Sequence, residues 1–230
     1  MMNEVTLEPC SHPAREFPAG VAIPEVDAVD EWVNSLTHAI GTILSLFGLV
    51  ALVMPPWYEG DYWRCLTFGI FGVTLILLYG ASTLYHAVRH PAYKERLRIA
   101  DHCAIYLLIA GSYTPFTLLV LEGVWRWGLL GAVWGLAGCG VAFKILSKWR
   151  LSSWSTGLYL AMGWLIVVAA EPLASRLHPT GLFLLMAGGG CYTFGVIFYL
   201  LDKRRFYHAI WHLFVMGGSA CHYCAAFFYL

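Results

Sequence analysis

Charged residues are scarce in this sequence. Only 12% of its 230 residues are Asp, Glu, Lys or Arg, whereas 59% are hydrophobic. An ordinary water-soluble domain carries roughly twice that share of charge, so lipid is the expected surrounding. The 14 basic and 14 acidic residues also cancel, which leaves no net charge to attract nucleic acid. We therefore expect a membrane protein without a nucleic-acid partner.

A disulfide framework and a signal peptide are also missing. The seven cysteines are odd in number and scattered through apolar runs, which favours reduced packing residues. Cys221 and Cys224 form a CxxC, but it lies inside an apolar run and carries no sign of a redox role. Residues 1–29 are polar and proline-containing and lack an apolar core. They predict a flexible, uncleaved cytoplasmic tail.

Apolar runs long enough to cross a bilayer recur along the rest of the chain, each near the roughly 20 residues required. They cover 32–54, 63–88, 101–121, 124–146, 154–172, 181–201 and 208–229. Short breaks separate the third run from the fourth and the fifth from the sixth, which indicates tight antiparallel hairpins. The pattern predicts an all-α, seven-transmembrane helix bundle over residues 30–230, placed as a multi-pass protein in the inner (plasma) membrane.

Basic residues set the expected orientation, because cytoplasmic loops are enriched in Lys and Arg. The breaks after the second, fourth and sixth runs hold most of them: Arg89, Lys94, Arg96, Arg98, Lys144, Lys148, Arg150, Lys203, Arg204 and Arg205. The other breaks and the tail hold only Arg15, Arg64, Arg126 and Arg176. This asymmetry predicts a cytoplasmic N-terminus and an external C-terminus.

Ionisable side chains at membrane depth are costly and usually face a functional site. The sequence has several near helix ends: Asn34 and His38, Ser82 and His86, Asp101, and His208 and His212. Each pair is spaced by four residues, so its members share one helix face. The predicted orientation brings all of them to the cytoplasmic end of the bundle, in one layer.

Three of these residues predict a zinc site. His208 and His212 lie on adjacent helical turns with Cβ atoms about 5–6 Å apart, a spacing that suits two ligands of one ion. Taken alone, this pair fits hydrogen-bonded packing equally well. His86 adds a third nitrogen donor at the same depth, and three histidines with an open position are typical of catalytic zinc. Structural zinc is the second interpretation, with Cys103 the one cysteine at this level.

Asp101 and Ser82 are the candidate catalytic residues. A carboxylate beside an activated water can accept its proton, although Asp also suits the N-terminal cap of a helix. Ser82 can hydrogen bond a ligand, the water or a developing oxyanion, or else its own i−4 carbonyl. Asn34 and His38 are expected to support the metal ligands from outside, with His38 paired to Asn34 and Glu31. Direct ligation by His38 is the alternative.

Three further histidines fit the site less well. His90 precedes Pro91, which disfavours helix there, so a place in the basic loop is expected. His102 points about 100° away from Asp101 around a helix, so only one of the two is expected to face the site. His222 lies about 21 Å beyond His208 along the helix axis and cannot share its ion.

The order of these motifs resembles the hemolysin III and progestin/adipoQ receptor (PAQR) family. The resemblance rests on Glu31-Trp-Val-Asn34 with His38, Ser82-Thr-Leu-Tyr-His86 with Asp101, and His208-Ala-Ile-Trp-His212. The lack of a long extra tail is similar to the compact bacterial branch. The resemblance implies seven helices, zinc on His86, His208 and His212, a site that includes Asp101 and Ser82, and kinship with alkaline ceramidase-like hydrolases.

Three functions are therefore weighed. The first is a zinc-dependent hydrolase that cleaves an amide or ester bond of a membrane lipid. The second is a non-enzymatic regulator of membrane lipid state or a receptor-like sensor, in which zinc only joins helices. The third is a pore-forming hemolysin, which is disfavoured because no run carries a polar stripe along its whole length. A membrane lipid is the expected substrate or ligand, and the oligomeric state stays open.

Overall fold

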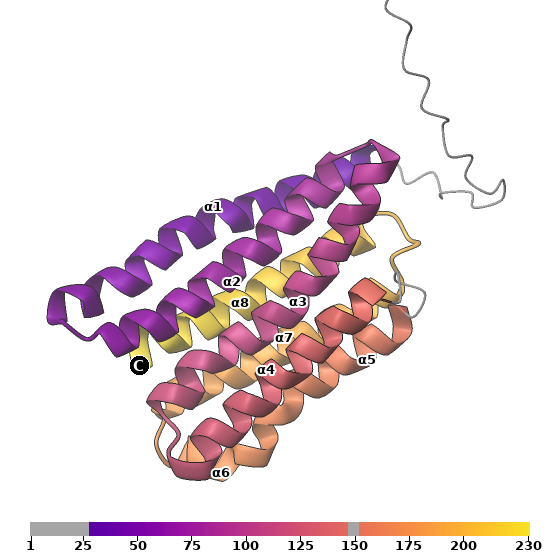
Figure 1. The fold of residues 1–230 in the computed structure, drawn as a ribbon. Helices are drawn as coiled ribbons and strands as arrows, with labels where there is room; N and C mark the ends of the chain where they lie inside the picture. The colour runs from indigo at the N-terminus through magenta and orange to yellow at the C-terminus, as the bar shows by residue number, and fades with distance from the viewer. Residues whose placement is uncertain (1–27, 147–151) are drawn as a thin grey trace, which may run out of the picture.

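The computed structural model describes residues 28–146 and 152–230, so nearly all of the predicted tail at 1–29 lies outside the described residues. The described elements are α1 (Ala28–Glu59), α2 (Tyr62–Ala87), α3 (Pro91–Leu119), α4 (Gly123–Leu146), α5 (Ser152–Gly163), the 3₁₀ helix η1 (Trp164–Ala169), α6 (Ala170–Ala174), α7 (Pro179–Leu200) and α8 (Tyr207–Tyr229). Because α5, η1 and α6 follow one another without a break, the described helices form seven rods (Figure 1).

Six of these rods are long and apolar enough to cross a membrane: α1, α2, α3, α4, the stretch Trp154–Ala174, and α7. Large apolar side chains such as Phe47 and Phe194 are exposed on the outside of the bundle, where lipid is the natural neighbour. The predicted all-α membrane bundle is therefore confirmed. The rod α8 has a suitable length, but it carries His208, His212 and His222 and is not among these six.

The start of α3 differs from the prediction. The helix begins at Pro91, ten residues before the apolar run at 101, with His90 in an extended conformation as its N-cap residue. Proline suits the first helical position because its missing N–H would have no helical partner there. The first turns of α3 are rich in Lys, Glu and Arg, so hydropathy could not reveal them. Asp101 therefore lies inside α3, and the helix-cap interpretation of this residue is wrong.

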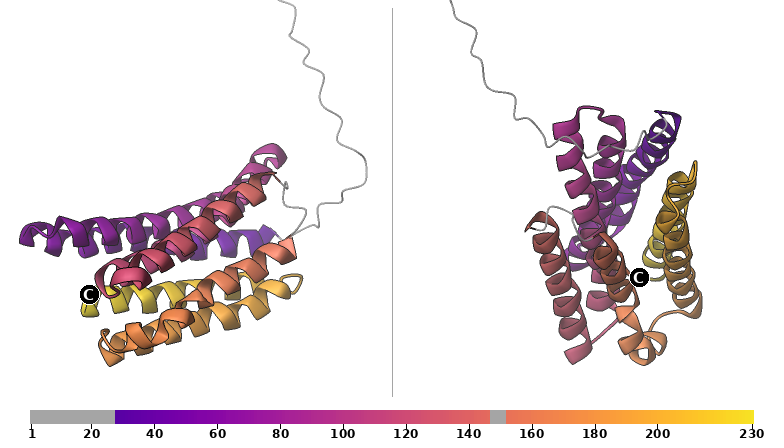
Figure 2. Two further views of the ribbon diagram at one scale, coloured as in Figure 1. Left: turned by 60° about the horizontal axis from the view of Figure 1, so that its bottom comes forward. Right: turned by 90° about the vertical axis from the view of Figure 1, so that its right-hand side faces the viewer.

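The helices pack mainly against their neighbours along the chain, and an internal cavity lies between them. Helix α1 packs along α2, α2 along α3, and α7 along α8, while α8 also contacts α1. The chain ends at the same end of the bundle as the connection between α1 and α2 (Figure 1). Figure 2 shows α7 and α8 side by side, in orange and yellow, in both further views. Contacts of α3 with α8 and of α5 with α7 are few, and the cavity described below lies there.

Glycines allow close helix contacts, and two of them illustrate this. A Cβ atom at Gly111 of α3 would collide with the Thr74 side chain of α2. A Cβ atom at Gly195 of α7 would lie 2.7 Å from the Cβ of Phe214 and 2.8 Å from the Trp211 ring of α8. Small residues at such positions let membrane helices approach closely, and the many van der Waals contacts that result stabilise the pair. These contacts hold α3 against α2 and α7 against α8.

Candidate metal centre

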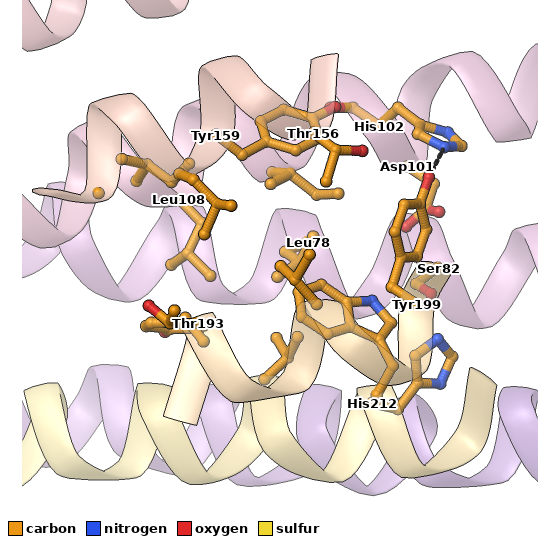
Figure 3. Close-up of a pocket in the computed structure, with 18 of the residues that line it drawn as sticks. Leu78, Ser82, Asp101, His102, Leu108, Thr156, Tyr159, Thr193, Tyr199 and His212 are labelled. Atoms are coloured by element: carbon orange, nitrogen blue, oxygen red, sulfur yellow. Dashed lines mark hydrogen bonds between the residues drawn. The ribbon is translucent and has the colours of Figure 1, made fainter. Parts of the chain in front are cut away.

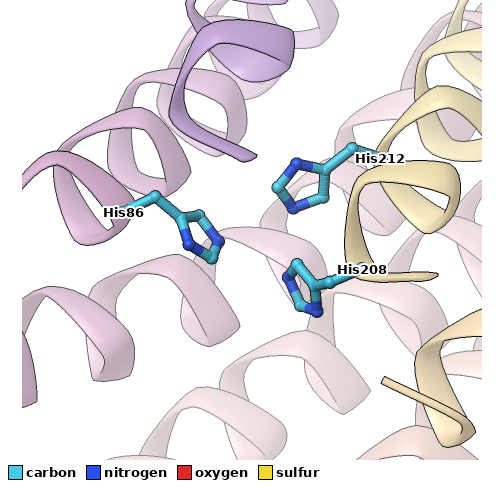
Figure 4. A group of neighbouring side chains, drawn as sticks. All are labelled: His86, His208 and His212. Atoms are coloured by element: carbon cyan, nitrogen blue, oxygen red, sulfur yellow. The ribbon is translucent and has the colours of Figure 1, made fainter. Parts of the chain in front are cut away.

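Three histidines meet at one end of the bundle. His86 lies in the last turn of α2, while His208 and His212 lie in the first two turns of α8. One nitrogen of each lies within 4.8 Å of the others, and this is the one such group found among the described residues. Figure 4 shows the three rings extending from α2 and α8 toward a common space. The ring centroids are 4.7 to 5.2 Å apart. The arrangement can hold a metal ion, as the sequence spacing predicted.

Hydrogen bonds orient two of the three rings. His86 Nδ1 lies 2.8 Å from Glu31 Oε2 of α1, and the other oxygen of this carboxylate lies 3.0 Å from Lys94 Nζ. His212 Nδ1 lies 3.2 Å from the backbone oxygen of Asn34. An ionised carboxylate and a carbonyl only accept hydrogen bonds, so Nδ1 carries the proton in both rings. Each Nε2 is left as the lone-pair donor, as in metal sites supported by outer carboxylates and carbonyls.

A nitrogen without a partner supports the fit to a metal ion. His86 Nε2 is buried and has no hydrogen-bond partner among the described residues. Leaving a buried polar atom unpaired is costly, and neutral imidazole nitrogens suit zinc and other transition metals. His86 thus has the burial, the tautomer and the neighbours that a metal ligand requires.

His38 occupies a different place from the predicted one. Its ring stacks on the ring of His212, with centroids 3.5 Å apart and planes 15° apart, and both of its nitrogens are buried without hydrogen-bond partners. The predicted pairing of His38 with Asn34 and Glu31 is wrong, because Glu31 binds His86 and the Asn34 carbonyl accepts from His212. His38 therefore supports the centre by packing against one of its rings.

Asp101 and Ser82 lie beside the histidines without joining their cluster. The Ser82 hydroxyl lies close enough to interact with the Asp101 carboxyl, and both side chains are buried. Figure 3 shows them at the end of a cavity that also holds His212. Asp101 is not among the groups within ligand distance of the three histidines. Its position suits a proton acceptor near the centre better than a fourth ligand.

Both Asp101 and His102 line this cavity, so the prediction that only one of them could face the site is wrong. His102 Nδ1 lies 2.7 Å from the Arg98 carbonyl, and its Nε2 lies 3.5 Å from the Tyr199 hydroxyl, the dashed line in Figure 3. The cavity follows a wide arc of α3, which accommodates two side chains about 100° apart.

The other two histidines lie away from the cluster, as predicted. His90 caps α3 and contacts the Tyr93 ring. His222 lies at the far part of the cavity, where its Nε2 is 3.3 Å from the Leu185 carbonyl oxygen. Neither residue belongs to the group that can hold an ion.

The cavity has a volume of about 370 Å³, within the usual range for small-molecule sites. One end is polar and holds Ser82, Asp101, His208 and His212, together with Arg98, Lys144, Tyr199 and Asp202. Further along, the walls become apolar and include Leu108, Ile109, Leu160, Trp164 and Val196. His208 and His222 both line it and lie about 21 Å apart along α8, since a helix rises 1.5 Å per residue. The space suits a long amphiphilic molecule.

Two residues near the site carry roles that the sequence left unassigned. Glu31 was expected only as a partner of His38, whereas it holds His86. Lys144 was counted only as a loop charge, although it lies inside an apolar run and is buried in the bundle. A charged residue within a membrane run is itself a signal of a site, and this signal could have identified Lys144.

The fold and site define a helical membrane protein with a three-histidine centre beside an internal cavity. Comparison with known proteins agrees with this class. The family model described as "Haemolysin-III related" matches residues 26–223. Hemolysin-3 of Bacillus cereus is 46% identical over 201 residues, which cover 87% of this chain and 92% of that protein. The monocyte to macrophage differentiation factor of Homo sapiens is 32% identical over 205 residues, covering 86% and 83%. The chain belongs to the haemolysin III family.

Proposed function

We propose that this chain is a zinc-dependent hydrolase that cleaves an amide or ester bond of a membrane lipid near the cytoplasmic face. The observation that carries the proposal is the placement of the three-histidine cluster at the polar end of a long cavity, with Asp101 and Ser82 beside it. Three nitrogen donors, with no fourth ligand beside them in the described part of the chain, are the composition of a catalytic zinc site. An apolar cavity inside a membrane bundle makes a lipid the natural substrate.

Each residue of the site has a distinct task. A zinc ion on His86, His208 and His212 would supply Lewis acidity, which activates water and polarises the bond to be cleaved. Glu31 and the Asn34 carbonyl hold the His86 and His212 rings in the orientation that presents Nε2.

The chemistry of proton transfer falls to the pair formed by Asp101 and Ser82. The Asp101 carboxylate can accept a proton at an Oδ atom, and the Ser82 hydroxyl fixes the direction of that carboxylate. The surrounding helices bury both groups and keep bulk water away from them. A buried base of this kind acts only on a molecule that has entered the cavity.

The position of the histidine cluster between two helices favours a second function, that of a regulator or sensor. The histidine cluster joins α2 to α8, so an ion there would cross-link helices from the two halves of the chain. A regulator or sensor of membrane lipids needs such a link but no turnover. The two functions differ in whether fatty acid is released.

The direct test uses purified protein in lipid nanodiscs, either loaded with zinc or treated with a chelator. Ceramide and ester phospholipids serve as amide and ester substrates, and released fatty acid is measured. We expect release only from the zinc-loaded protein. Full zinc content with no release from either lipid class would reject the hydrolase and leave the regulator.

We further propose that α8 is a seventh span, with the N-terminus cytoplasmic and the C-terminus external. Its 23 residues extend about 34 Å, enough for a hydrocarbon core of about 30 Å. Basic residues gather in the connections on the side where α1 begins.

A topology reporter tests this arrangement. Fused after Leu230, it is expected to score as external, while a reporter inserted between Lys203 and Arg204 scores as cytoplasmic. The measurement is the activity of a reporter that works on one side of the membrane only. An internal score at Leu230 would contradict the orientation and the placement of the site near the cytoplasmic face.

The contact between Glu31 and His86 predicts that Glu31 strengthens metal binding without being a ligand. We expect Glu31→Ala to weaken zinc binding by about 10- to 100-fold, because the carboxylate fixes the tautomer and direction of His86. Competition with a zinc chelator of known affinity measures the change. Glu59→Ala is the matched control, since this acid lies on the same helix and its side chain is 61% exposed. Equal affinity in both variants would show that Glu31 does not position the ligand.

A further inference from the structure

Lys144 is a buried cation that forms no contact ion pair in the described part of the chain. It lies in the last turn of α4, and only 1% of its surface is exposed. Its Nζ donates one hydrogen bond, to Ser155 Oγ at 3.2 Å. The ion pairs among the described residues do not include it. Buried charges in proteins are normally paired, so an ammonium in this state has capacity for an anion.

The environment of Lys144 is the polar end of the cavity. Arg98 of α3 lines the same end and lies within electrostatic range of Lys144. The hydroxyl groups of Thr156 and Tyr199 line it as well. Asp101 is near enough to attract Lys144 electrostatically, but no contact ion pair joins the two side chains among the described residues. Two cations and several hydroxyl groups therefore border one part of the space.

The remainder of the cavity determines what kind of anion can enter. Figure 3 shows Asp101, His102 and Tyr199 gathered at one end, with Leu108 and Thr193 toward the other. Between the two ends the walls are mostly apolar. A small free anion would fill only the polar end, whereas an anion attached to a hydrocarbon chain would fill both.

We propose that Lys144 and Arg98 bind the phosphate headgroup of a single-chain lipid whose hydrocarbon chain occupies the apolar part of the cavity. This inference rests on the proposed lipid substrate and names its class. A phosphate monoester carries between one and two negative charges at neutral pH, which two cations complement better than one. Lysine binds phosphate as a compact charge and arginine through its planar fork of donors.

The depth of Lys144 in the bundle agrees with this assignment. It lies two residues before the end of α4, a helix long and apolar enough to cross the membrane. Ends of membrane-spanning helices lie at the level of the lipid headgroups, where phosphate is abundant. The alternative is a structural role, in which Lys144 interacts with the C-terminal end of α4 and links it to α5 through Ser155.

The test measures binding with ligands that cannot be hydrolysed at the chain linkage. The purified full chain is titrated with an ether-linked alkyl lysophosphatidate and with the alkylglycerol of the same chain length. We expect the phosphate lipid to bind at least about tenfold more tightly, the scale of one charge-assisted hydrogen bond. Oleate and inorganic phosphate serve as a carboxylate amphiphile and a free anion. Native mass spectrometry counts bound ligand in each case.

Variants separate recognition from structure. Lys144→Met is expected to lose the preference for the phosphate lipid while binding alkylglycerol as wild type does, and Lys144→Arg is expected to retain most of it. Arg204→Gln is the matched control, because this exposed cation does not line the cavity. Equal binding of the two ether lipids by wild type would overturn the proposal without any variant. The proposal would also be overturned if inorganic phosphate competed for the site as well as the phosphate lipid does. It would be overturned too if the binding of oleate depended on Lys144 as strongly as the binding of the phosphate lipid.

The readout does not depend on turnover or on zinc. Binding preference retained in chelator-treated protein supports the headgroup site even if no lipid is hydrolysed. Conversely, hydrolysis of neutral lipids with no phosphate preference would leave the hydrolase standing and reject this site. The two proposals can therefore fail separately.

Discussion

Alanine in place of any one of His86, His208 and His212 is expected to reduce bound zinc from about one ion per chain to nearly none. Each substitution leaves two nitrogen donors where the cluster has three. Loss of an outer supporting residue alone commonly costs 10- to 100-fold in affinity, so loss of a ligand should exceed about a hundredfold. Metal analysis of the purified variants measures the zinc content.

Two other histidines provide the controls. His90→Ala and His222→Ala should hold zinc close to the wild-type amount, because both residues lie outside the cluster. His222 is the stricter control, since it lines the same cavity and sits on the same helix as two of the ligands. Full zinc in His86→Ala would contradict the proposed centre, because α8 would then bind the ion without α2.

Asparagine at position 101 is expected to abolish most turnover while the zinc stays bound. The change keeps the shape of Asp101 and a hydrogen bond with Ser82, but it removes the group that accepts the proton. Loss of a general base commonly costs on the order of a hundredfold or more in rate. Zinc content and fatty acid release are measured on the same preparation of Asp101→Asn, so the two effects can be compared directly.

The results that would contradict this role are distinct. Loss of zinc in Asp101→Asn would make Asp101 a ligand. Unchanged hydrolysis would place the base elsewhere, and His102 and His38 are then the next residues to replace, because both line the cavity. Ser82→Ala is expected to lower the rate by a smaller factor than Asp101→Asn, since it removes only the hydroxyl that orients the carboxylate.

The histidine cluster could be predicted from the sequence because it depends on only two properties, the helical spacing of the residues and the direction of each helix. Helical spacing puts His208 and His212 on one face, and alternating directions of the helices bring His86 to the same end. Both properties follow from hydropathy and residue numbers alone. The structure brings these three residues together as expected.

Other parts of the site depend on how each helix is rotated about its axis, which periodicity does not determine. Glu31 points toward His86 and away from His38 for this reason, and His102 faces the cavity together with Asp101. The start of α3 at Pro91 was missed for a different reason. The first turns of α3 are rich in charged residues, so their hydropathy is as low as that of a loop.

Two of the three histidines belong to α8, which is made after the other described helices. More than half of the given sequence lies between His86 and His212, so the three side chains cannot meet until α8 has been made. Helix α8 is also the one described rod that is not among the six helices long and apolar enough to cross a membrane. Its neighbours α7 and α1 must already be in place to receive it. A product that lacks α8 would keep only His86 of the three histidines, so metal content would report whether α8 has joined the bundle.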